Sequence, residues 1–100
     1  MPKVMLNSTV GQQAAIRRFP AHATLIEETI VYSESFRGLC DDLAEAERAL
    51  AATVQMPEAL RRDRRAECEE WVESLTNEIE RVLRVAKVVH LAEAKCKPPR

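Results

Sequence analysis

Apolar and small residues recur through the first half of this chain with the spacing of an amphipathic helix. They are separated by alternating steps of four and three residues, through Leu25, Thr29, Tyr32, Phe36, Leu39, Leu43, Ala46, Leu50 and Thr53. Steps of this kind place all members on one narrow face of an α-helix, as in a coiled coil. A helix with such a face is stable when the face is buried against another helix.

A second pattern of the same kind lies between Pro57 and Lys95. Its members are Leu60, Cys68, Trp71, Leu75, Val82, Val85 and Val89, with Val72, Ile79 and Ala86 beside them. Pro57 ends a preceding helix and is favoured at the start of a new one. The short connection before Pro57 makes the two helices antiparallel. We therefore predict an all-α fold, a long helical hairpin with helices at about 21–54 and 57–95.

The first 20 residues form a lead-in to this hairpin. Thr9 and Gln12 have the spacing of a capping box, which predicts a short helix from Val10 to Arg18 that stops before Pro20. Thr24 and Glu27 have the same spacing and mark a start for the predicted helix at about 21–54, although Pro20 could equally occupy a first helical position. Residues 96–100 are expected to fray.

Composition and charge narrow the class of protein. About half of the 100 residues are Ala, Glu, Lys, Leu or Arg and only two are Gly, which is typical of long helices. The formal net charge of −1 argues against nucleic-acid and membrane-surface binding. The opening MPKVMLNSTV lacks the pattern of a signal peptide, and no apolar run is long enough for a membrane span. The three cysteines are an odd number and do not have the spacing of a disulfide framework. We expect a cytoplasmic protein with reduced thiols.

The segment 82–92 is apolar around most of its circumference. One neighbouring helix cannot cover such a surface, so either the lead-in folds back on it or a second copy of the chain packs there. We predict a homodimer, most simply a dimeric four-helix bundle. Its expected interface contains Ile79, Val82, Val85 and Val89.

Four arginines near the start of the second helix form the main charged cluster: Arg61, Arg62, Arg64 and Arg65. They suit phosphates or an acidic partner. The alternative is a solvated face, balanced by Asp41, Asp42, Glu45 and Glu47 across the hairpin and by Glu67, Glu69 and Glu70 along the same helix. We favour the solvated face because no aromatic residue lies among the arginines. They remain the candidate partner-binding residues.

Histidines and cysteines are the remaining candidates for chemistry. His22 and His90 are expected to approach each other at the open end of the hairpin, where Glu93 or Cys96 would complete a weak metal site. Their spacing matches no recurrent metal motif, so we expect no metal. Cys40 and Cys68 are expected to be buried, and Cys96 to be exposed.

The sequence contains no Gly-rich phosphate loop and no Ser-His-Asp set, so we predict no catalytic residue and no cofactor. The predicted function is non-enzymatic, a helical self-association and interaction module with an unidentified protein partner. The alternative is a small nucleic-acid-binding regulator that uses the patch 61–65.

Overall fold

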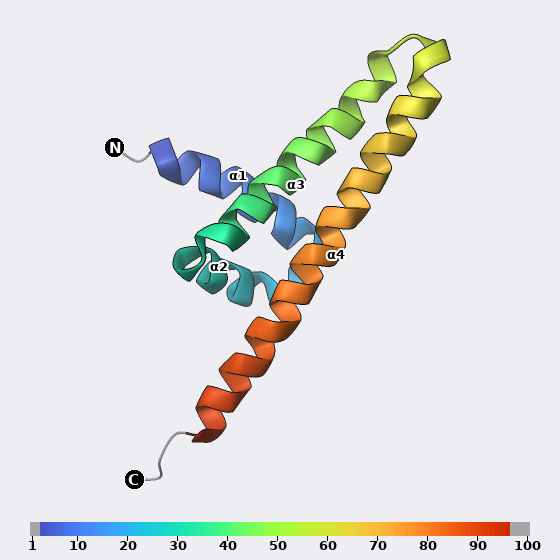
Figure 1. The fold of residues 1–100 in the computed structure, drawn as a ribbon. Helices are drawn as coiled ribbons and strands as arrows, with labels where there is room; N and C mark the ends of the chain where they lie inside the picture. The colour runs from blue at the N-terminus through green and yellow to red at the C-terminus, as the bar shows by residue number, and fades with distance from the viewer. Residues whose placement is uncertain (1–2, 97–100) are drawn as a thin grey trace.

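A computed structural model describes the backbone of residues 3–96 and the side chains of residues 10–87. Between residues 3 and 96 all regular structure is helical and no strand occurs, which confirms the all-α class. Figure 1 shows the elements, which are α1 (Lys3–Arg18), the 3-10 helix η1 (Pro20–His22), α2 (Ala23–Tyr32), α3 (Glu34–Ala52), the 3-10 helix η2 (Thr53–Gln55) and α4 (Glu58–Cys96).

The lead-in helix α1 is longer than predicted. It runs through Thr9, so Thr9 does not start it, and it ends at Arg18 as expected. Pro20 lies two residues after Arg18 and restricts Phe19, whose φ of −130° and ψ of 64° are not helical. The chain therefore turns at Phe19 and passes through η1 into α2.

The prediction of one helix at 21–54 is wrong, because the helical conformation is interrupted at Ser33, between α2 and α3. Ser33 has an extended backbone, with φ −125° and ψ 108°, and its Oγ accepts a hydrogen bond of 3.1 Å from the backbone N–H of Phe36. This is an N-cap, and Glu34 follows it in the first turn, where a negative charge favours a helix start. Thr24 is not a cap either, since α2 begins at Ala23.

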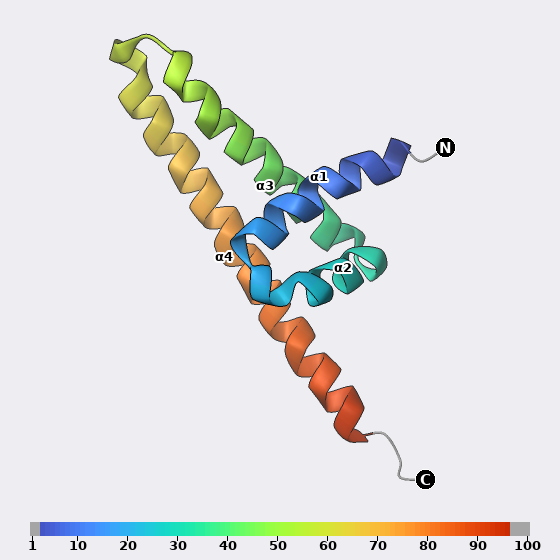
Figure 2. The same cartoon turned by 180° about the vertical axis from the view of Figure 1, so that it is seen from behind.

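A compact turn joins α3 to α4, close to the predicted position. Thr53 Oγ1 donates a 2.7 Å hydrogen bond to the carbonyl of Leu50, and the carbonyl of Pro57 accepts from the backbone N–H groups of Leu60 and Arg61. Met56 is extended, with ψ 155°, and so reverses the chain direction. As a result, α3 and the first half of α4 lie side by side and run in opposite directions (Figures 1 and 2).

The segment α1–α2, here called the N-terminal arm, folds back against this pair. Helix α1 crosses α3 with small buried residues at the contact, namely Gly11, Ala14 and Ala15. A Cβ atom at Gly11 would lie only 2.8 Å from the backbone N of Asp41 and 2.9 Å from the carbonyl carbon of Cys40. The absence of a side chain at Gly11 therefore sets how closely the two helices approach.

The core lies where the arm meets α3 and α4. Its largest fully buried side chains include Ile26, Phe36, Leu43 and Ile79. On α4 the buried residues are Cys68, Val72, Ile79 and Leu83, whereas Leu60, Trp71 and Val85 of the predicted stripe are exposed. Tyr32, also predicted to be buried, is exposed as well.

The difference on α4 has a simple geometric cause. The prediction placed a single partner helix on α4, but the arm also reaches it, with Phe19 and His22 beside Leu83 and Arg18 beside Val72. The buried face is therefore turned toward the arm. It includes Val72 and Ile79, which the sequence placed only at the margin of the stripe.

Candidate functional site

The arginine cluster occupies the first turns of α4, and all four side chains are exposed. Arg64 Nη1 lies 3.1 Å from Glu67 Oε1, and Arg65 Nε lies 3.0 Å from Glu69 Oε2. Arg61 Nη2 donates a 3.2 Å hydrogen bond to the carbonyl of Met56. The expected balance along the same helix is therefore confirmed for Glu67 and Glu69, whereas no ion pair of Glu70 is found among the described side chains.

The expected balance across the hairpin is not found within the described side chains. Glu45 pairs instead with Arg48 at 3.8 Å, and Glu47 pairs with Arg17 and Arg18 of the arm. Glu45 thus faces its own helix and Glu47 faces α1. The pairs of Glu47 form because α1 crosses α3, and the sequence patterns did not predict that crossing.

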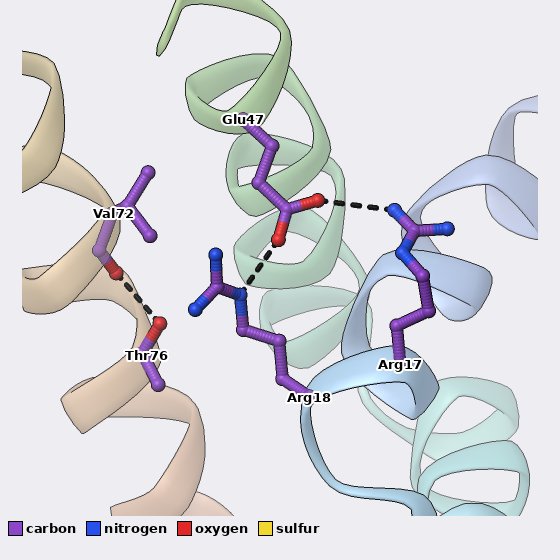
Figure 3. Close-up of polar contacts among 5 residues, drawn as sticks. All are labelled: Arg17, Arg18, Glu47, Val72 and Thr76. Carbon is purple, nitrogen blue, oxygen red and sulfur yellow. Dashed lines mark hydrogen bonds and ion pairs between the residues drawn. The ribbon is translucent and has the colours of Figure 1, made fainter. Parts of the chain in front are cut away.

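Figure 3 shows the arm's ion pairs, a cluster that the sequence analysis missed. Arg17 Nη2 lies 3.0 Å from Glu47 Oε1, and Arg18 Nε lies 2.6 Å from Glu47 Oε2. Arg18 points into the space between α3 and α4, toward Thr76, whose Oγ1 donates to the carbonyl of Val72. One carboxylate therefore ties the end of α1 to α3. We interpret this arrangement as structural, because each carboxylate oxygen of Glu47 is already paired with an arginine side chain.

The histidines are placed only in part. His22 is half-buried in η1, beside Leu83, Arg84 and Lys87 of α4. The side chain of His90 lies outside the described residues. Among the described side chains no three His, Cys, Asp or Glu residues are grouped in a way that would hold a metal ion.

Cys40 and Cys68 are free thiols, and both are buried as predicted. Burial raises the pKa of Cys40 to about 12, and the negative charge of Asp41 adds to the effect. A thiol attacks other molecules as its thiolate, so Cys40 is poorly suited to nucleophilic chemistry. The side chain of Cys96 lies outside the described residues.

The raised pKa of Cys40 makes the free energy of unfolding depend on pH. Below about pH 9 the thiol is protonated in both states. Above it the unfolded chain loses the proton while the folded chain keeps it, so the free energy of unfolding falls by about 1.4 kcal/mol per pH unit up to about pH 12. Denaturant titrations between pH 8 and 10.5 should show a shallower decline for Cys40→Ala. Equal declines in the two proteins would contradict this role for Cys40.

The most informative surface is a line of exposed apolar residues on α4. Leu60, Trp71 and Val85 are 61%, 42% and 58% exposed, and we call these three residues the outer stripe. Their separations of 11 and 14 residues are about three and four helical turns, so all three lie on one face. That face is turned by about 100° from the buried residues Val72 and Ile79.

The four predicted interface residues are divided by this geometry. Ile79 is fully buried within the single chain, because the arm and α3 already cover it, and Val82 is half-buried. Val85 is exposed and belongs to the outer stripe. The side chain of Val89 lies outside the described residues.

No helix in the described part of the chain is both long and apolar enough to cross a membrane. Comparison with models of protein families, with curated proteins and with solved structures finds no match to this chain.

Proposed function

We propose that this protein is a non-enzymatic helical module that self-associates through α4 and, in that form, binds another macromolecule. The observation that carries the proposal is the outer stripe, three large apolar side chains that remain exposed on one face of α4. In both views of the fold the other helices lie on one side of α4 (Figures 1 and 2). The outer stripe, turned by about 100° from the buried face, is exposed on a flank of α4.

Two features favour self-association over a role of the stripe in folding. The buried face of α4 already packs on the arm and α3, through Val72, Ile79 and Leu83. The outer stripe adds nothing to that core. In a two-fold dimer the outer stripe of each copy packs against the other copy, so both exposed stripes are buried in a single interface.

The proposal predicts that Val85→Glu splits the dimer and leaves the helices folded. Val85 is exposed in one chain, so the carboxylate would be buried only in the dimer, where an unpaired charge is costly. Sedimentation equilibrium should report a dimer for the unchanged protein and a monomer for Val85→Glu, with unchanged helical circular dichroism.

The matched control is Val31→Glu, since Val31 is also exposed but lies on α2. It should remain dimeric. An unchanged protein that stays monomeric up to high micromolar concentration would overturn the proposal.

The alternative function is a small regulator that binds nucleic acid through Arg61, Arg62, Arg64 and Arg65. Its support is that all four side chains are exposed at one end of the molecule. The ion pairs to Glu67 and Glu69 reduce the positive potential there. Strong retention on heparin that is lost when the four arginines are changed to serine would favour this alternative.

A further inference from the structure

We infer that the second copy lies antiparallel on the outer stripe, with the two-fold axis beside Trp71. The inference rests on the proposed self-association through α4 and adds the direction and register of the pair. In this register, residues at equal distances before and after position 71 face each other across the axis. Position 60 then faces position 82, and position 64 faces position 78.

The side chains around Trp71 are complementary in this register. Eleven residues away in the two directions are Leu60 and Val82, which are both apolar, and both are on or beside the outer stripe. Seven residues away are Arg64 and Glu78, which carry opposite charges and are exposed. The pair therefore places Leu60 against the partner's Val82 and Arg64 against the partner's Glu78, each twice.

Other arrangements bring like charges together on the same face. A parallel pair in register would place Arg64 against the partner's Arg64 and Glu78 against the partner's Glu78. An antiparallel pair shifted so that Leu60 meets the partner's Val85 would place Glu67, on the face of the outer stripe, against the partner's Glu78. Like charges facing each other across an interface disfavour it. The register centred on Trp71 avoids these contacts.

The contacts within one chain are compatible with this register. Arg64 already pairs with Glu67 at 3.1 Å and would lie between that carboxylate and the partner's Glu78. The segment from Leu60 to Val82 spans about 33 Å of helix at 1.5 Å per residue, and beyond it Val85 faces the partner's Pro57, which is exposed just before α4. Within this segment Leu60, Arg64, Trp71 and Glu78 are exposed in the single chain.

Charge reversal tests the register directly. Arg64→Glu and Glu78→Arg should each raise the dissociation constant of the dimer by about tenfold or more, since each creates two pairs of like charges. The double variant restores opposite charges and should return to within about threefold of the unchanged protein. Glu73→Lys, exposed and away from the outer stripe, is the control and should leave the dissociation constant unchanged.

Distances between spin labels test the direction of the pair. A label at Leu60→Cys in a Cys96→Ser background should give a separation of about 33 Å between copies, because position 60 lies eleven residues from the axis in each chain. A parallel pair would bring the labels to about 10 Å, the spacing of packed helices. The native Cys40 and Cys68 are buried and should not take up the label.

The outcomes separate this inference from the proposed function. A monomeric unchanged protein overturns both. A dimer that Val85→Glu splits, but in which the double charge variant stays as weak as the single ones or the labels lie near 10 Å, overturns the register and leaves self-association in place. Restored affinity together with a separation near 33 Å supports the antiparallel register.

Discussion

Phe36→Ala is expected to lower the free energy of unfolding by about 3–5 kcal/mol, the range for a fully buried aromatic side chain. Phe36 is only 1% exposed and lies in the core formed by the arm, α3 and α4. Removing the ring loses its burial and leaves a cavity that the neighbouring helices fill only in part. Chemical denaturation followed by circular dichroism measures the change.

Tyr32→Ala is the matched control for this substitution. Tyr32 belongs to the same stripe in the sequence, four residues before Phe36, but it is 86% exposed. Its loss should change the free energy of unfolding by less than about 0.5 kcal/mol. Similar losses at the two positions would contradict the break at Ser33, which turns the two aromatic side chains to different surroundings.

The second large effect is expected at Gly11. Gly11→Ala would place a Cβ atom against the backbone of Cys40 and Asp41, which cannot move without shifting α3. Overpacking costs about 1–3 kcal/mol, and the rigid neighbours favour the upper end of that range. Alanine improves helix propensity by about 1 kcal/mol, so the expected net loss is about 2 kcal/mol.

Gly38→Ala is the control, and it should have the opposite sign. Gly38 lies within α3, and its Cβ would meet nothing within 4 Å. The substitution should raise the free energy of unfolding by about 0.5–1 kcal/mol through helix propensity alone. Denaturant midpoints that moved in the same direction for both glycines would show that α1 does not approach α3 as closely as described.

The sequence patterns predicted the helical class and the position of the main turn. The helix expected at about 57–95 is observed at Glu58–Cys96, because Pro57 and the apolar period define it locally. The burial of Cys40 was also predicted from its position beside the stripe. The helical class and the position of the turn depend on neighbours within a few residues along the chain.

The break at Ser33 was missed although its local signal is present. Serine followed by an acidic residue is a recognisable helix start. The alternating four and three spacing continues through it, and a periodic pattern alone cannot show that the second helix is rotated relative to the first. In the folded chain, the hydrogen bond from the Phe36 N–H to Ser33 Oγ caps α3 and so fixes its start after Ser33.

The contacts of the arm could not be predicted from short-range sequence patterns, for a different reason. The ion pairs of Arg17 and Arg18 with Glu47 join residues about thirty positions apart, and the Gly11 contact joins α1 to the middle of α3. Neither follows from helical spacing. The arm also lies beside Leu83 of α4, through Phe19 and His22, so the buried face of α4 could not be separated from the outer stripe in the sequence.

The arm has a consequence for how the molecule opens. Arg18 lies beside Val72, and Phe19 beside Leu83, so the arm covers apolar residues that α3 alone leaves in contact with water. Detaching the arm would therefore expose part of the core of α4 at once. Partial opening of this kind costs a large share of the total stability, and the described helices should unfold as one cooperative unit.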